Sequence, residues 1–170
     1  MKIHLPASWT RAALICVAAA SLGACVTPAF DPQGALTGIA PWEVSGQPRD
    51  PGDVVSGDVI WGGVIVQVHH YESDSEIEVL AYPLDSAQRP QPRAPSQGRF
   101  RIRLPGYVES VDFPEGLFLS VRGRLVGTRD GVIEKSRYVY PVITDAQIRR
   151  WPPGFQFDQH RWSVGFGVIL

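Results

Sequence analysis

Short segments in which apolar and polar residues alternate, separated by loops rich in proline and glycine, constrain the fold of this chain more than any other feature. The clearest is RFRIRL at 99–104, where three apolar side chains alternate with three arginines. A period of two is typical of a strand with one buried face. The 170 residues also include 17 Gly and 15 Pro, which both disfavour helix interiors. We therefore expect an all-β domain.

Five segments carry the strand pattern, at 59–68, 76–82, 99–104, 117–126 and 138–143. Gly62 and Gly63 interrupt the first segment, at 59–68, and predict a bulge or sharp bend there. Gly123 lies in the fourth segment, at 117–126. Glycines at such positions permit the strong coiling that closes a small sheet. We expect an antiparallel OB-like barrel of five to six strands. The residues expected in its core or at its rim are Trp61, Phe100, Phe118, Tyr138 and Tyr140.

The connections between the expected strands differ in character. Residues 83–98 form a proline-rich arm, in which Asp85 is expected to cap a turn through its side chain. Residues 128–131 predict a tight turn with a positive φ at Gly131. Residues 105–116 form a long connection whose apolar side chains are expected to plug one end of the barrel, namely Tyr107, Val108, Val111 and Phe113.

Residues 1–24 indicate a lipoprotein signal peptide. Lys2 and Arg11 supply its positive region, and residues 12–22 form an apolar stretch too short for a bilayer core, which needs about 20 residues. The segment ends in the lipobox-like sequence Leu22-Gly23-Ala24-Cys25. We expect cleavage before Cys25 and a covalent lipid on this cysteine, with no other cofactor. The alternative is an ordinary secretory signal with a chance cysteine.

Cleavage would leave 146 residues (170 minus 24) with 14 basic and 17 acidic side chains, a formal charge of −3. Each buried acyl methylene contributes about 0.8 kcal/mol, so several acyl chains would hold the protein firmly on a membrane. Val26 follows the cysteine in place of the aspartate that commonly marks retention in the inner membrane. The expected location is therefore the outer membrane, facing the periplasm.

The remaining chain divides into three expected parts. Residues 25–53 contain five prolines and four glycines, which predicts a semi-extended tether, with residues 36–39 and Trp42 as candidates to dock on the domain. Residues 54–151 are expected to form the barrel domain. Residues 152–170 form an aromatic and glycine-bearing tail, expected to be an edge strand or a lipid-contacting segment. Its alternating apolar residues are Trp162, Val164, Phe166 and Val168.

A series of short motifs behind the lipobox resembles the Slp family of starvation-inducible outer-membrane lipoproteins of Gram-negative bacteria. These motifs are WGGVI at 61–65, IEVL at 77–80, YPLD at 82–85, GRF at 98–100, VRGRLVG at 121–127, YVYPV at 138–142 and Trp151. Their order and spacing carry the resemblance. It implies an envelope lipoprotein linked to starvation or stationary-phase stress, and it brings no agreed catalytic residues.

The best candidate for catalysis is the segment from His69 to Glu78, which suggests a metal-assisted or acid/base hydrolase of cell-envelope polymer, or a Ca²⁺ site made of carboxylates. Adjacent strand residues point to opposite faces, so His69 and His70 cannot easily share one metal. The alternative is a solvated turn. We therefore expect no catalytic and no metal-binding residues. The polar side chains in question are His69, His70, Tyr71, Glu72, Asp74, Glu76 and Glu78.

Positive charge in the mature chain is almost wholly arginine, with 13 Arg and one Lys. Five of these arginines fall on two expected strands and are expected to project from the outer surface: Arg99, Arg101, Arg103, Arg122 and Arg124. Guanidinium groups pair well with phosphates and carboxylates, so an envelope protein, a lipid headgroup or peptidoglycan are candidate partners. The alternative is cross-strand pairing of Arg101 and Arg103 with Glu76 and Glu78.

The near-neutral charge argues against nucleic-acid binding. Two cysteines exclude a disulfide scaffold or a four-cysteine zinc site. Two hypotheses remain: a non-catalytic lipoprotein that binds an anionic envelope component, and a hydrolase.

Overall fold

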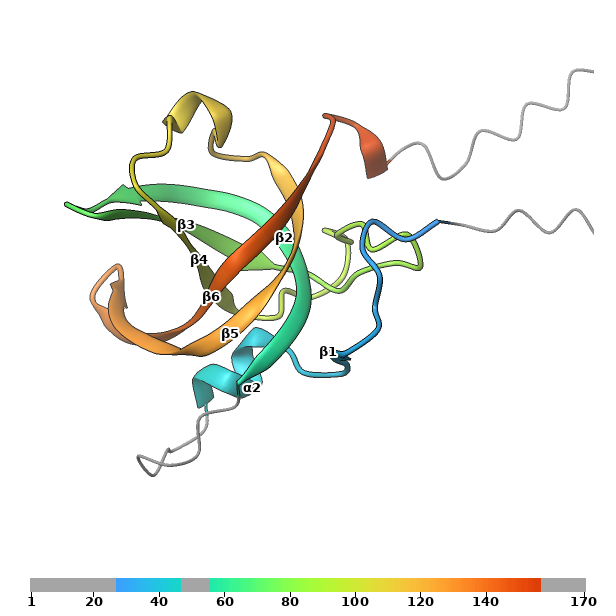
Figure 1. Cartoon of the computed structure of the whole chain (residues 1–170), viewed down its shortest axis with the longest axis horizontal. Coiled ribbons are helices and arrows are strands. Elements are labelled where there is room, and N and C mark those ends of the chain that lie inside the picture. The colour runs from blue at the N-terminus through green and yellow to red at the C-terminus, as the bar shows by residue number, and fades with distance from the viewer. Residues whose placement is uncertain (1–26, 47–55, 157–170) are drawn as a thin grey trace, which may run out of the picture.

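The structure, a computed structural model, describes residues 27–46 and 56–156. These residues form an all-β fold, as expected, with one short helix (Figure 1). None of the helices in these two ranges is long and apolar enough to span a membrane. The elements in chain order are β1 (Ala35–Leu36), α2 (Pro41–Gly46), β2 (Gly57–His70), β3 (Asp74–Ala81), β4 (Arg99–Pro105), the 3₁₀ helix η1 (Ser110–Asp112), β5 (Phe118–Ile133) and β6 (Ser136–Trp151).

The strands pair in the order β1-β2-β3-β4-β6-β5, and β5 also pairs with β2. The pairing from β2 to β5 therefore runs in a ring. Most neighbours are antiparallel, whereas β4 and β6 run parallel and meet only where Arg101 lies beside Val142 and Ile102 beside Ile143. All five predicted strands are present, and the last two are much longer than the sequence pattern indicates.

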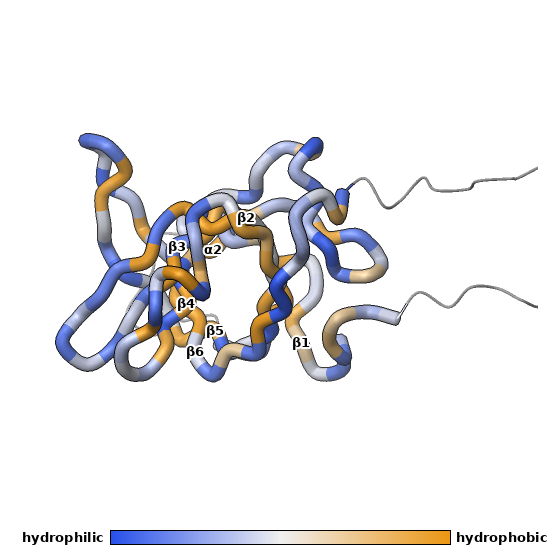
Figure 2. Tube along the Cα trace, turned by 90° about the horizontal axis from the view of Figure 1, so that it is seen from above, coloured by the Kyte–Doolittle hydropathy of each residue, from blue (hydrophilic) through white to orange (hydrophobic). Residues whose placement is uncertain are grey.

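Apolar side chains from alternate positions fill the interior of the ring, and Figure 2 shows the hydrophobic residues concentrated along its strands. Phe100 and Ile102 of β4 are fully buried, as the alternation predicts. The rings of Trp61 and Phe100 meet edge to face, with centroids 5.3 Å apart. Tyr140 is also buried, so three of the five expected core aromatics lie in the interior.

Gly63 lies where β2 changes partners, because the strand pairs with β5 up to Val64 and with β3 from Gly63 onward. A Cβ atom on Gly63 would lie 2.0 Å from the carbonyl oxygen of Leu80, so this close approach of two backbones requires glycine. The bulge predicted at this point lies instead between Ile65 and Gln67.

The predicted turn at residues 128–131 is wrong, because β5 continues to Ile133 and the chain reverses at Glu134, whose φ is 55°. Gly131 lies within the strand and is not among the residues with positive φ. A Cβ atom there would lie 2.6 Å from Cε2 of Tyr140. The glycine therefore makes room for the tyrosine ring rather than for a turn.

Part of the segment expected to be a tether packs on the sheet, and the predicted docking of residues 36–39 is confirmed. β1 pairs in parallel with the start of β2, and Leu36 and Ile39 pack against the core. The indole nitrogen of Trp61 donates a hydrogen bond to the carbonyl oxygen of Ile39 (2.8 Å). Trp42 bonds only through its backbone, to Gln97 (3.0 Å), and its side chain is exposed.

The expected plug between β4 and β5 is wrong for Tyr107 and Val111, which are both exposed. Phe113 does pack against the core. After β6 the chain turns so that Phe155 is buried against Phe118, with ring centroids 5.3 Å apart. The predictions for the lipobox, Cys25 and the tail beyond Gln156 concern residues outside the described ranges.

Candidate functional site

Glu76 and Glu78 lie on β3 and are almost completely buried, with 0% and 1% of their surface exposed. They alternate with Ile77 and Val79, which point into the core. The interpretation of residues 69–78 as a solvated turn is therefore wrong for these two carboxylates. The long β5–β6 hairpin brings Arg129 and Tyr140 against them, so both faces of β3 are covered.

Three guanidinium groups surround the carboxylate of Glu76. Nη1 of Arg101 lies 3.1 Å from Oε2, while Nε of Arg103 (3.2 Å) and Nη1 of Arg129 (2.8 Å) lie beside Oε1. Arg103 lies directly opposite Glu76 in the sheet register, and Arg129 comes from β5. The cross-strand pairing considered from the sequence is therefore present, with a third arginine added by the hairpin.

The carboxylate of Glu78 is held by groups from three other strands, β2, β4 and β6. Nη1 of Arg99 lies 2.6 Å from Oε1, which also accepts a hydrogen bond from the Tyr140 hydroxyl (3.3 Å). Nε2 of His69 and Nε2 of Gln67 lie 3.2 and 3.3 Å from Oε2.

Arg101 joins the two carboxylates, because its Nη2 also lies 3.6 Å from Oε2 of Glu78. Its guanidinium carbon lies 4.1 Å from the centre of the Tyr140 ring, and its Nη1 donates a hydrogen bond to the Tyr71 hydroxyl (3.4 Å). Its Nε has no hydrogen-bond partner within the part of the chain that the structure describes. Arg101 is therefore a structural residue beneath the surface, and the expectation that it projects from the surface is wrong.

We call Glu76, Glu78, Arg99, Arg101, Arg103 and Arg129 the arginine cluster. Four guanidinium groups face two carboxylates, which leaves a formal charge of +2 when His69 is neutral. The side chains of Arg99, Arg103 and Arg129 are 26%, 32% and 36% exposed. The excess positive charge therefore reaches the surface through these three residues.

Glu78 and Arg101 keep their charge at neutral pH. Burial raises the pKa of Glu78, but hydrogen bonds from Arg99, His69 and Gln67 outweigh this effect, so the pKa of this carboxyl lies below its ordinary value. Burial lowers the pKa of Arg101, but Glu76 and neighbouring charges outweigh it, so the net pKa is raised. Burial and the Glu78 charge raise the pKa of Tyr140. Glu78 and Tyr140 are therefore poorly suited to proton transfer near neutrality.

The five arginines expected at one surface divide into two groups. Arg99, Arg101 and Arg103 belong to the arginine cluster. Arg122 and Arg124 instead face Asp58, at distances of 3.2 and 3.9 Å. Arg122 also donates hydrogen bonds to the backbone carbonyls of Asp31 (2.7 Å) and Gln33 (3.1 Å).

Sequence reasoning missed Arg129, because its segment was assigned to a turn. Thr128, Asp130 and Val132 are exposed whereas Arg129, Gly131 and Ile133 are partly buried, so the alternation of β5 does continue through it. The alternation lies in burial and not in hydropathy, because Arg129 is partly buried whereas Val132 is exposed, so the sequence carries no signal that extends the strand.

The two adjacent histidines contact different groups, as neighbouring strand residues on opposite faces do. His69 faces Glu78, whereas Nδ1 of His70 lies 3.3 Å from the Ser75 hydroxyl and its ring stacks on Tyr107. In residues 27–46 and 56–156, no group of three or more His, Cys, Asp or Glu side chains is placed to hold a metal ion.

Comparison with known proteins identifies the family. The model of the Outer membrane lipoprotein Slp family matches residues 22–166. A curated relative is the Outer membrane protein Slp of Escherichia coli K12, 26% identical over 123 residues, which are 71% of this chain and 65% of that protein. The Uncharacterized lipoprotein YeaY of the same organism is 32% identical over 97 residues, 57% of this chain and 50% of YeaY.

An uncharacterized protein of Haemophilus influenzae is 35% identical over 98 residues, 57% of this chain and 53% of that protein. This chain thus spans about half to two thirds of the length of these relatives. A solved structure, Schizosaccharomyces pombe Pot1pC bound to ssDNA, matches 58% of this chain and 81% of that chain at 10% identity, with a TM-score of 0.31, a value too low to support an argument about fold or ligand. The family match covers most of the sequence, and the chain therefore belongs to the Slp family of outer-membrane lipoproteins.

Proposed function

We propose that this chain is a non-catalytic component of the cell envelope, linked to starvation or stationary-phase stress, which carries lipid on Cys25 and binds an anionic partner through the arginine cluster. The observation that supports the binding role is the +2 charge of the cluster, carried to the surface by three partly exposed arginines. Guanidinium groups bind carboxylates and phosphates through charge-assisted hydrogen bonds. The partner is expected in the periplasm.

The non-catalytic role is supported by the state of the groups that a hydrolase would need. Glu76 and Glu78 are buried beneath arginines and the β5–β6 hairpin, so a polymer has no access to either carboxylate. Glu72, in the same segment of residues 69–78, is exposed and so is a carboxylate that a substrate could reach. We expect His69→Ala and Glu72→Ala to leave a folded protein whose contribution to stress survival is unchanged. Loss of that contribution with retained folding would favour the hydrolase.

We further propose that the ring of strands is an OB-like barrel. The pairing order β2-β3-β4-β6-β5 with return to β2 supports this description, and so does the parallel contact of β4 with β6. OB folds are five-stranded, partly open barrels that present a ligand-binding face. Because fold alone does not establish function, the binding role depends on the arginine cluster.

Photo-crosslinking in intact cells tests the binding role. A photoreactive aromatic side chain replaces Tyr71, an exposed residue whose ring lies 5.2 Å from the Arg129 guanidinium, and for comparison the exposed Val111 of η1. We expect an adduct at position 71 that is absent at position 111. Arg103→Gln together with Arg129→Gln should abolish it.

The matched control is Arg137→Gln, because Arg137 lies near the same hairpin end but pairs with Asp130 outside the cluster. This variant should leave the adduct unchanged. An adduct at position 71 that persists in the double variant, or equal adducts at both positions, would refute binding at the arginine cluster.

A further inference from the structure

We infer that one end of the ring lies directly on the phospholipid headgroups of the membrane. This end consists of residues 30–33, the turn at residues 85–93 and residues 152–156 after β6, and we call it the anchor end. The inference rests on the proposed lipid at Cys25 and concerns what that lipid does to the orientation of the domain.

Within residues 27–46, a pair of hydrogen bonds fixes the chain to the domain at Phe30, only five residues after the cysteine proposed to carry lipid. The backbone N–H of Phe30 donates a hydrogen bond to the Gln88 side chain (2.7 Å), whose amide donates back to the Phe30 carbonyl (3.0 Å). Arg122 then holds the carbonyls of Asp31 and Gln33. Residues 30–33 are therefore attached to the sheet at several points.

Gln88 is itself fixed by a rigid turn. The Asp85 carboxylate accepts hydrogen bonds from the backbone N–H groups of Ala87 (2.9 Å) and Arg89 (2.8 Å), which confirms the predicted cap. The buried Ser120 hydroxyl donates to the carbonyl of Gln88 and accepts from the Trp151 indole. The chain near the lipid is thus linked through one turn to β5 and to the end of β6.

The short spacer sets the reach of the domain. Five residues at about 3.6 Å each place Phe30 no more than about 18 Å from Cys25. A headgroup layer takes up roughly 5–8 Å of this span, as judged from the bilayer thickness with and without headgroups. A free tether of residues 25–53 would instead have reached about 90 Å at 3.1 Å per residue. The domain therefore has no room to stand away from the membrane.

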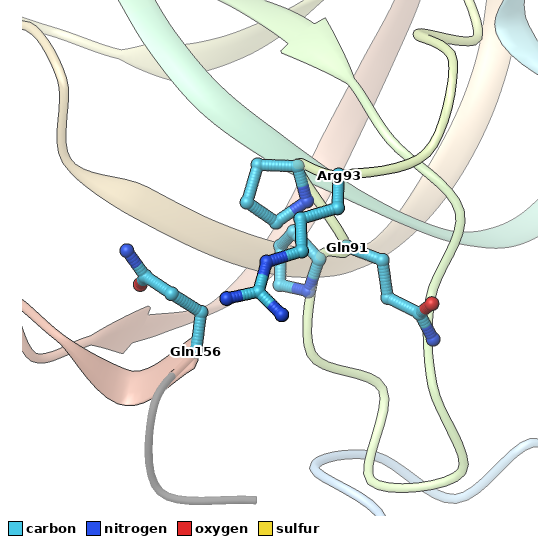
Figure 3. A pocket seen from close by; sticks show the side chains of 5 residues that line it. Gln91, Arg93 and Gln156 are labelled. Atoms are coloured by element: carbon cyan, nitrogen blue, oxygen red, sulfur yellow. The ribbon is translucent and has the colours of Figure 1, made fainter.

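The anchor end gathers features suited to a lipid surface. Figure 1 shows the described N-terminal end, the connection after β3 and the end of β6 on one side of the ring, opposite the β2–β3 and β5–β6 hairpin tips. Figure 3 shows the Arg93 guanidinium between Gln91 and Gln156 at a hollow of about 80 Å³. These groups can donate hydrogen bonds to phosphate oxygens.

This orientation turns the arginine cluster away from the membrane that carries the protein. Arg129 lies on the β5–β6 hairpin, and its guanidinium lies 5.2 Å from the ring of Tyr71, which directly follows β2. Both therefore lie toward the end opposite the anchor end. The arginine cluster therefore binds an anion that lies on the periplasmic side, and it does not reach the headgroups of the leaflet that carries the protein.

Fluorescence quenching on vesicles tests the orientation. The exposed residues Ser86, at the anchor end, and Ser136, at the opposite end, are replaced in separate variants, Ser86→Cys and Ser136→Cys, in the mature lipidated protein. Each cysteine carries a fluorophore, and the vesicles contain phosphatidylethanolamine with a nitroxide on its headgroup. We expect the label at position 86 to lose most of its fluorescence and the label at position 136 to lose little. Equal quenching at both positions would overturn the orientation.

Two matched insertions distinguish a short spacer between Cys25 and Phe30 from a long tether of residues 25–53. A flexible Gly-Ser insert of about twelve residues adds a root-mean-square span of about 20 Å. Placed after Thr27 it should release the label at position 86 from quenching, whereas placed after Asp50 it should change nothing. Equal effects of the two inserts would overturn the short spacer. Flotation with the vesicles is recorded in parallel, since a mature protein that does not float would overturn the lipid anchor itself and with it the orientation.

Discussion

The buried position of Glu76 makes a sharp prediction about stability. In Glu76→Gln the side chain keeps its shape, but the negative charge shared by Arg101, Arg103 and Arg129 is removed. Of the three, Arg101 is only 7% exposed, so its charge cannot be hydrated without opening the fold. Glu78 then remains as its only carboxylate within the cluster, at 3.6 Å.

The size of the effect follows from the exposure of the partners. Removing one member of a buried ion pair costs about 3–5 kcal/mol, because it leaves a buried charge without compensation. Arg103 and Arg129 are about a third exposed, so water can take over part of their interaction with Glu76. We therefore expect the free energy of unfolding to fall by about 3 kcal/mol, toward the lower end of that range.

Urea denaturation followed by tryptophan fluorescence measures this change, with Trp61 as a buried reporter. The slope of the free energy of unfolding against urea concentration should stay constant, while the midpoint concentration of urea falls. Arg137→Gln provides the control, since its pair with Asp130 is largely exposed and should contribute little. A fall of less than about 1 kcal/mol in Glu76→Gln would refute the argument that Glu76 compensates a buried charge on Arg101.

Three further predictions concern pH, packing and the lipid. Because the pKa of Glu78 in the folded state lies below its ordinary 4.5, its contribution to stability is present above that pH and is lost as the pH falls through the folded-state pKa; urea midpoints measured from neutral to acidic pH should therefore decline below about pH 4.5, and less so in Glu78→Gln. Gly131→Ala places a methyl group 2.6 Å from Cε2 of the buried Tyr140 and should cost about 1–3 kcal/mol, with an unchanged midpoint contradicting the packing. Cys25→Ala should move the protein from the membrane fraction to the soluble fraction, and its retention in the membrane would refute the lipid anchor.

The strand content could be predicted because period-two alternation is a local property of the sequence. β4 follows the pattern at 99–104 almost to the residue. The full lengths of β5 and β6 could not be predicted in the same way. Register shifts between Leu125 and Gly127 and a positive φ of 51° at Asp145 interrupt the alternation while the strands continue. Only their pairing with each other keeps these segments extended.

The buried arginine cluster depends on contacts that local pattern does not carry. Glu76 and Glu78 alternate with apolar residues as in a strand with one solvated face. They are buried because Arg129 and Tyr140, more than fifty residues later in the sequence, pack over them. The docking of Phe30 depends in the same way on Gln88, 58 residues away. The candidate arginines were therefore identifiable from sequence, but their division into two groups was not.

The two glutamates of the arginine cluster do not neutralise all of its positive charge, and we propose that the remaining charge binds an anion. The most direct measurement is the side-chain Nε–H resonance of each arginine in the mature lipoprotein, in detergent, during titration with inorganic phosphate. We predict saturable shifts at Arg103 and Arg129, with little change at Arg137. Equal shifts at all three arginines, or none within the cluster, would contradict the account.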